Sequence, residues 1–380
     1  MVVCALLFDA CKKEELEIER AQSQEVFSNT ISLIWNQNDF ETKKDVEVGL
    51  TWCFSFLGAD LPIGGIQQAL VWDSHNVINL DLRELGFNSL ALMEISKLVE
   101  FFKESEAYKL HGAADVGRFV AVVFNNSHNY YKIVGMPTHL NEFNKPFIYL
   151  KKKAAIIESA VAFGERIIEL PRTSKSIERM GYVAHELEGS ISKNTQVIKE
   201  FEEMDVMKNG QLRFGVYNVN GKLIQGADPN LSSAGKPAKC LWCHETRIQI
   251  GFAAQTAVSG FYAPWEFDSI VNSNSETLQL YRNSLKSGID FEDFKAHTEL
   301  EKLYIRFMEP SAKRLSQEWG ISIDEVNIKL NRLKTHNNLE FPEMGKLFTR
   351  TDVEQFAPFH SLPISNDARE VIGTEFNFLK

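Results

Sequence analysis

The sequence predicts an α+β protein, with β-hairpins in its N-terminal and middle regions and a mainly helical C-terminal third. The strongest hairpin signal lies at residues 212–224, where alternating apolar residues precede the turn-forming pair Asn220-Gly221. Apolar residues recur at helical spacing over 276–285 and 292–308. We expect the C-terminal helices to pack around a loop at 226–239 that leads to a motif at 240–244.

The N-terminal elements are predicted from capping residues and from the period of the apolar positions. Spaced apolar residues predict a short helix within 26–35, and the polar residues 36–47 predict a loop. Asn88 or Ser89 can cap a helix over 88–105. A β-branched run at 117–124, turn residues at 125–129 and a second run at 130–134 predict a β-hairpin. Residues 147–170 fit either a helix or a strand.

The C-terminal elements lead to a division of the chain into domains. Pro310 suits the start of a helix that ends at Trp319, before Gly320, and 324–333 predict another helix. A chain of 380 residues exceeds one typical core. We expect a truncated signal at 1–11, a tether with a short helix at 12–47, an α+β domain at 48–170, and a domain at 171–380 that carries the motif and the C-terminal helices.

The first residues resemble a truncated bacterial lipoprotein signal. Val2 to Phe8 is apolar, Ala10 precedes Cys11, and a charged segment follows. The resemblance implies that Cys11 is lipidated and that the protein is extracytoplasmic, in the periplasm or anchored at the outer membrane. The alternative is an ordinary apolar N-terminal strand.

Charge and hydropathy limit the classes of partner. A formal net charge of −10 disfavours nucleic acid as a partner. It is compatible with docking to a redox partner protein. No run of 18 apolar residues follows the N-terminus, so we expect contact with a membrane through the lipid anchor only.

The sequence Cys240-Leu241-Trp242-Cys243-His244 has the spacing that attaches a c-type haem. Two thiols three positions apart can reach the two vinyl groups of a porphyrin, and the adjacent imidazole can bind the iron. The alternatives are a zinc site, a thioredoxin-type redox pair and a structural pair. Zinc would need two further ligands, and a redox pair is expected to follow a strand rather than a loop.

Residues 236–245 resemble the haem-binding segment of c-type cytochromes. The resemblance implies one covalent haem c, with Cys240 and Cys243 as thioether sites and His244 as the proximal iron ligand. Residues 171–380 would then form a haem c-binding domain. The β-hairpin before the motif is unlike the small all-helical cytochromes and closer in outline to the β-rich haem c proteins of the hydroxylamine-oxidising type.

The sixth iron position is not determined by the sequence. Met308 lies downstream of the motif, as the distal methionine does in small cytochromes, and Met136-Pro137 repeats their local pattern. An open position is the alternative, and it would permit catalysis or gas binding. The remaining candidates are lone histidines, which are more often ordinary core or surface residues: His185, His297 and His360.

Three functions follow from these observations. The favoured one is single-electron transfer by an exported mono-haem c-type protein. The second is a haem c enzyme or gas sensor with an open distal site. The third is a haem-free surface lipoprotein in which Cys240 and Cys243 serve structure.

Overall fold

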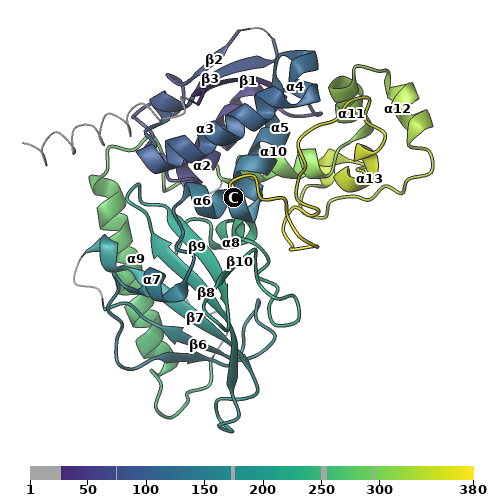
Figure 1. Cartoon of the computed structure of the whole chain (residues 1–380). Coiled ribbons are helices and arrows are strands. Elements are labelled where there is room, and N and C mark those ends of the chain that lie inside the picture. Colours follow the sequence, from purple (N-terminus) through teal and green to yellow (C-terminus); the bar gives the residue numbers. More distant parts are fainter. Residues whose placement is uncertain (1–26, 74, 173–175, 250–254, 294–295) are drawn as a thin grey trace, which may run out of the picture.

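The computed structural model describes residues 27–73, 75–172, 176–249, 255–293 and 296–380. Figure 1 shows helices gathered above a large antiparallel sheet, with a small helical lobe at one side. The predicted signal at 1–11, including Cys11, lies outside the described residues. The α+β fold class is confirmed, because helices and hairpin strands coexist and the C-terminal region is helical.

Within the described residues, the strands form a six-stranded sheet and a four-stranded sheet. The larger sheet is antiparallel in the order β10-β9-β8-β7-β6-β5. Its strands are β5 (Ala154–Ile156), β6 (Arg166–Glu169), β7 (Gly181–Glu188), β8 (Val197–Val206), β9 (Leu212–Asn218) and β10 (Leu223–Ile224). Because β6 pairs with β7, the sheet crosses the boundary that we predicted after residue 170.

The predicted middle hairpin is confirmed as β9 and β10, with Leu223 opposite Tyr217. Its turn differs in detail from a two-residue turn. The N–H of Gly221 donates to the carbonyl of Asn218, and only Gly221 of the turn has a positive φ, at 71°. This pattern is a turn followed by one left-handed residue, which glycine adopts without strain.

The smaller sheet has the order β2-β3-β1-β4 and contradicts one N-terminal prediction. Residues 27–35 of the predicted helix do not form one, because Thr30–Ile34 is strand β1 and buries Ile31 and Leu33 at the period of a strand. The other strands are β2 (Leu70–Trp72), β3 (Val77–Asp81) and β4 (Ala114–Asp115). The tether prediction for 12–47 was therefore wrong over residues 30–47, and residues 12–26 lie outside the described residues.

The loop predicted at 36–47 is shorter than expected. Helix α2 (Lys43–Phe56) begins inside it, because the side chain of Thr42 accepts from the N–H of Asp45 while the Asp45 carboxylate accepts from the N–H of Thr42. This reciprocal cap satisfies two free N–H groups at the helix start. Helix α3 (Ser89–Glu104) confirms the helix predicted at 88–105, with Asn88 as its cap.

The hairpin predicted at 117–134 is wrong, since this segment is helical. It forms α5 (Val116–Val120), a π-helical turn η2 (Ala121–Asn125) and α6 (Ser127–Ile133). Asp115 and Asn126 cap α5 and α6. The whole run 116–125 is buried, so it lacks the one-sided pattern that separates helix from strand.

The predicted C-terminal helices are present, and residues 147–170 contain strands β5 and β6. Residues 276–285 fall almost wholly within α9 (Pro264–Ser284), and 292–308 contain α10 (Thr298–Met308). Helix α11 (Ala312–Trp319) ends before Gly320, and α12 (Ile323–Lys329) follows. The short elements are α4 (Glu106–His111), α7 (Leu140–Asn144), α13 (Arg350–Glu354) and the single turns η1 (Leu82–Leu85), η3 (Ile177–Arg179) and η4 (Pro342–Met344).

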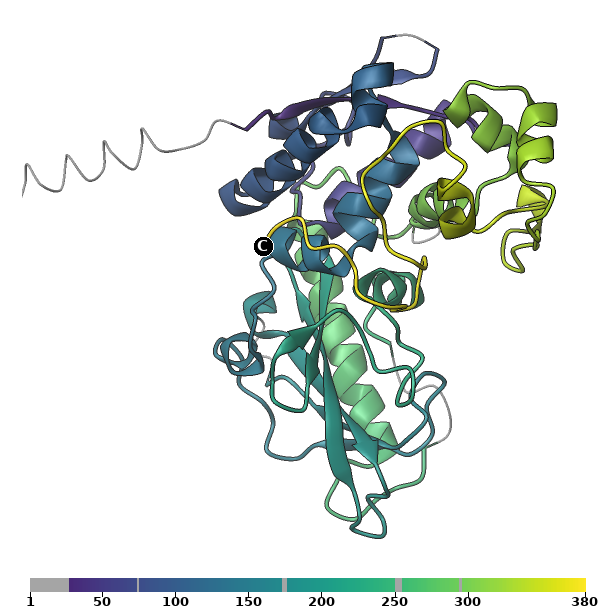
Figure 2. The same ribbon diagram turned by 45° about the vertical axis from the view of Figure 1, so that its right-hand side comes forward.

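The larger sheet is covered on both faces. Helix α9 lies along one face, where Asn274 donates to the hydroxyl of Tyr182 (Figure 2). On the other face, Met136 and Phe147 lie against Gly215 and Gly181, at positions where a Cβ would approach them within 3 Å. These two glycines therefore let the segment around α7 approach the sheet closely.

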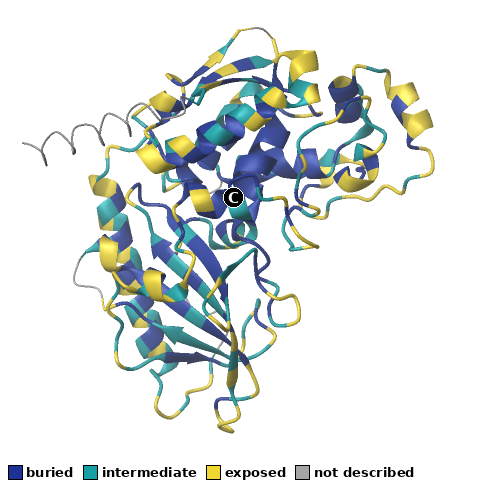
Figure 3. Ribbon diagram, viewed as in Figure 1, coloured by how far each residue is buried: buried dark blue, intermediate teal, exposed yellow. Residues whose placement is uncertain are grey.

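The centre of the molecule is helical. Helix α10 packs against α2 and α5, and all three are largely buried (Figure 3). A second apolar cluster fills the side lobe of α11, α12 and α13. Within this lobe, Arg350 joins α13 to α11. It is 1% exposed and forms paired hydrogen bonds with the Glu318 carboxylate, at 2.9 Å each.

Candidate functional site

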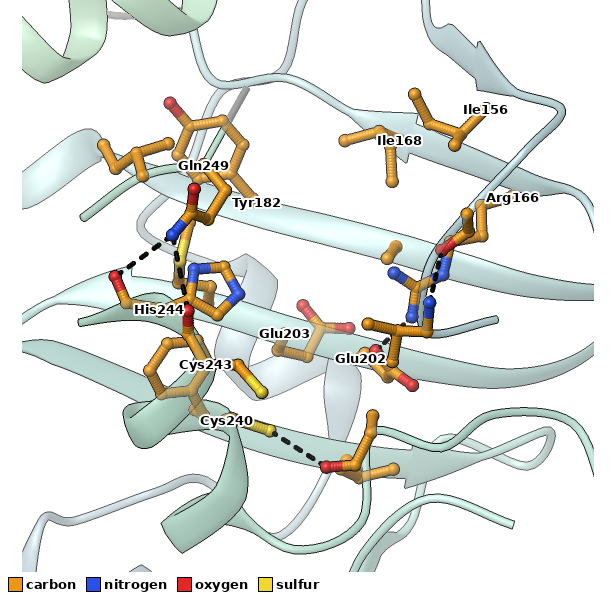
Figure 4. Close-up of a pocket in the computed structure, with 18 of the residues that line it drawn as sticks. Ile156, Arg166, Ile168, Tyr182, Glu202, Glu203, Cys240, Cys243, His244 and Gln249 are labelled. Atoms are coloured by element: carbon orange, nitrogen blue, oxygen red, sulfur yellow. Dashed lines mark hydrogen bonds and ion pairs between the residues drawn. The ribbon is translucent and has the colours of Figure 1, made fainter. Parts of the chain in front are cut away.

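The predicted motif lies on helix α8 (Pro237–His244), which packs against β9, α6 and η2. The loop predicted at 226–239 therefore ends in a helix that begins at Pro237, where the missing N–H is not needed. Cys243 and His244 follow Cys240 by three and four positions, so all three residues share one face of the helix. Figure 4 shows Cys240, Cys243 and His244 close together at one side of a pocket.

The pocket is formed between this face of α8, the larger sheet and α9. It holds about 1140 Å³ of empty space, counting the part that opens to solvent. Most of its lining side chains are apolar, and they come from six elements and the loop after α8: Ile156, Ile168, Ala184, Met204, Phe214, Val216, Ile248, Phe267 and Val271.

The ring of His244 is held by a hydrogen bond and by a ring contact. Its Nδ1 lies 3.1 Å from the carbonyl oxygen of Arg247, and its ring lies 4.9 Å from the ring of Phe214. A carbonyl can only accept, so Nδ1 carries the proton and Nε2 keeps its lone pair. Burial lowers the pKa of His244, which favours the neutral imidazole that binds metals.

Cys240 and Cys243 are free thiols. Cys240 is partly exposed and its Sγ lies 3.9 Å from the carbonyl of Ala234, whereas Cys243 is exposed. Desolvation of the sulfur atoms raises the pKa of both thiols, although Cys243 as a whole residue is exposed. A thioredoxin-type pair has a thiol of lowered pKa, and the shift at these two cysteines is in the opposite direction.

One end of the pocket carries ionisable side chains, partly or fully buried, that the sequence analysis did not single out. Arg166 forms ion pairs with Glu186 and Glu202, and it lies with Glu202 in the pocket wall (Figure 4). Glu200 is 2% exposed, and burial raises its pKa to about 8. Burial also raises the pKa of Glu186. Strand pairing places Arg166 opposite Glu186 and Glu186 opposite Glu200, so these side chains share the pocket face.

The residues present fit a covalent haem c. Both thiols and the imidazole come from one face of one helix, next to a pocket with apolar walls. His244 already has the Nδ1 partner that metal-bound histidines have in other proteins. The fit therefore rests on the donor set and on the polarity of its surroundings.

The predicted sixth ligands lie elsewhere. Met308 is buried at the end of α10, and Met136 lies against Gly215 on the face of the sheet that is opposite to the pocket. His185 also points to that face, where its Nε2 lies 3.0 Å from the Glu169 carboxylate. His297 is buried at the start of α10, and His360 is exposed. The methionine in the pocket wall is Met204, which sequence reasoning missed because β8 was not predicted.

The described residues offer no evidence of an all-protein metal centre. Among them, no group of three or more His, Cys, Asp or Glu is arranged to hold a metal ion. This bears on the zinc alternative, which needs four protein ligands, and not on haem, whose porphyrin supplies four of the donors to iron. In the same part of the chain, no helix has the length and hydropathy of a bilayer span.

Comparisons with known proteins add no relative. Neither the protein-family models, nor the curated proteins, nor the solved structures contain a match to this chain. The site is therefore interpreted from its own residues.

Proposed function

We propose that the protein is an exported mono-haem c protein that transfers single electrons. The observation that carries the proposal is that Cys240, Cys243 and His244 line one pocket while the Nδ1 of His244 is bonded to a carbonyl. This arrangement offers two attachment points and a neutral nitrogen donor to the same space.

Each part of the site has a physical role in this proposal. The two thiols would hold the cofactor covalently, which prevents its loss outside the cytoplasm. His244 would bind the iron through Nε2, and the apolar walls would keep water away from it. When bound, haem iron supplies one-electron chemistry by cycling between Fe(II) and Fe(III). Retention at a membrane through lipidated Cys11, and a redox partner protein, belong to the same proposal.

The deciding measurement is a pyridine haemochrome spectrum of the denatured protein. Residues 12–380 would be exported from a host that has the haem-maturation machinery. We expect the α band of haem c in the wild type and its complete loss in Cys240→Ala/Cys243→Ala, because both thioether bonds would be gone. Cys53→Ala serves as the matched control, since this buried thiol belongs to the core around α2. A colourless wild type from a competent host would refute the proposal and favour the haem-free surface lipoprotein.

A second candidate function is a haem c enzyme or gas sensor with an open distal position. It is favoured by the finding that Met308, Met136 and His185 are not in the pocket wall. We expect the ferrous protein to bind carbon monoxide, with a shifted Soret band, if the sixth position is open. An unchanged spectrum would mean that a side chain occupies the iron, and Met204→Ala would then test the methionine of the pocket wall.

A further inference from the structure

The turn after His244 has an unusual backbone. Glu245 and Thr246 both have positive φ, at 47° and 64°. This region is rarely adopted by residues other than glycine and is least favourable for a β-branched residue such as threonine. Thr246 is also 1% exposed, and its hydroxyl has no hydrogen-bond partner. Such a turn persists only where its surroundings hold it in place.

This turn determines how the ring of His244 is oriented. The N–H of Arg247 donates to the carbonyl of His244 at 2.7 Å, and the carbonyl of Arg247 lies 3.1 Å from the Nδ1 of His244. His244 therefore contacts Arg247 through both its backbone and its ring. If residues 245 and 246 relaxed to ordinary φ values, the Arg247 carbonyl would leave the imidazole.

Arg282 holds the turn from outside. It lies in α9 and is 7% exposed, and its Nη2 donates to the carbonyl of Thr246 at 2.8 Å. Its Nε donates to the carbonyl of Gly210 at 2.8 Å, in the turn between β8 and β9. The guanidinium lies 4.3 Å from the ring centre of Phe291. The side chain thus joins the histidine turn to the sheet that forms the pocket wall.

Arg282 is a buried side chain that donates hydrogen bonds to two backbone carbonyls. The ion pairs of the described residues include no carboxylate partner for this side chain. Its partners in hydrogen bonds are two carbonyls, and burial lowers its pKa to about 9. A buried cation without a counter-charge is unfavourable for folding, so a role beyond packing is the more economical explanation.

We propose that Arg282 is a positioning residue that fixes the ring of His244 through the carbonyl of Thr246. The hydrogen bond from Arg282 to Thr246 keeps the Nδ1–H of His244 on the Arg247 carbonyl and its Nε2 toward the pocket. The inference rests on the proposed function, because the orientation of His244 matters only if Nε2 binds iron. It adds that the strength of the iron–histidine bond is controlled from α9, a helix outside the motif.

The first test uses protein produced without the maturation machinery, so that it does not depend on haem. Histidine labelled with ¹⁵N reports the tautomer of each ring by NMR. We expect a single Nδ1–H tautomer for His244 in the wild type and a mixture of tautomers in Arg282→Met, which removes both donors at similar volume. An unchanged tautomer in Arg282→Met would overturn the proposal.

Two further variants separate positioning from loss of stability. Leu278→Ala creates a cavity in α9 four residues before Arg282, at a residue that is 2% exposed. The substitution leaves the hydrogen bonds of Arg282 in place. It should lower stability and leave the tautomer unchanged. Thr246→Gly removes the strain of the left-handed residue, so Arg282→Met/Thr246→Gly should recover the single tautomer. Failure of this rescue, or mixed tautomers in Leu278→Ala, would show a purely structural role.

The second test uses the haem-loaded protein. A hydrogen bond from Nδ1 makes the imidazole a stronger donor, which stabilises Fe(III). Arg282→Met should therefore raise the midpoint potential and weaken the iron–histidine stretch in resonance Raman spectra, with an unaltered haemochrome yield. An unchanged potential in a fully loaded variant would contradict the inference alone, whereas a wild type without haem would contradict the proposed function.

Discussion

Lys236→Met is expected to lower the free energy of unfolding by about 3–5 kcal/mol, because it leaves a buried carboxylate without its counter-charge. Lys236 is completely buried at the start of α8. Its Nζ donates to Asn125 at 2.7 Å, to the carbonyl of Asp367 at 2.7 Å and to Glu375 at 3.0 Å. All three ammonium hydrogens are thereby used, so methionine cannot replace any of these contacts.

Urea unfolding at neutral pH measures this effect, with Lys239→Met as the matched control. Lys239 lies one turn further along the same helix and pairs with Glu370, which is 42% exposed. A pair with one partner exposed to solvent is screened by water and contributes about 1 kcal/mol. Equal losses in the two variants would contradict the prediction. Lys236→Met/Glu375→Leu should regain part of the loss, since the uncompensated charge is then removed as well.

The second large effect concerns pH and the buried acid Glu301. It lies on α10, it is 2% exposed, and both carboxylate oxygens are without hydrogen-bond partners. Burial raises its pKa from 4.5 to about 9. Between these values the folded protein binds a proton that the unfolded chain releases, so stability is full below pH 4.5 and is lost as pH rises toward 9.

Glu301→Gln should remove this dependence, because the amide has no charge at any pH. We expect equal stability of the two proteins near pH 4.5 and a gain of a few kcal/mol for the variant near pH 9, since one pKa unit corresponds to about 1.4 kcal/mol. Chemical denaturation across this pH range provides the measurement. Glu299→Gln is the control on the same helix, where the carboxylate pairs with Lys302 and is partly exposed. The prediction would be refuted if the free energy of unfolding of Glu301→Gln changed with pH in parallel with that of the wild type.

Elements with strong local signals were predictable from the sequence. The hairpin at 212–224 and the helix after Asn88 carry turn and cap residues beside apolar residues of the right period. The run 116–125 was not predictable in this way, because α10 and neighbouring helices bury it on all sides. Strand β1 was missed for a related reason, since its five residues are too few to distinguish the two periods.

The candidate site was predictable only where its residues are adjacent in sequence. Cys240, Cys243 and His244 form a motif, and the structure places all three in the wall of one pocket. Arg166 and Glu202 reach the same pocket through strand pairing, which the local pattern does not specify. Arg282 could not have been found at all from the sequence, because its contact with Thr246 spans 36 residues and uses a backbone carbonyl.

The contact between Lys236 and Glu375 has a consequence for the order of events during synthesis. The two residues are 139 positions apart, and the carboxylate also accepts from Ser127 and Ser365. The buried contacts of Lys236 at the start of α8 can therefore be completed only after residue 375 has been synthesised and has packed against it. Before that point the helix that carries Cys240 and Cys243 lacks these contacts, so we expect it to be less firmly packed while the chain is being synthesised.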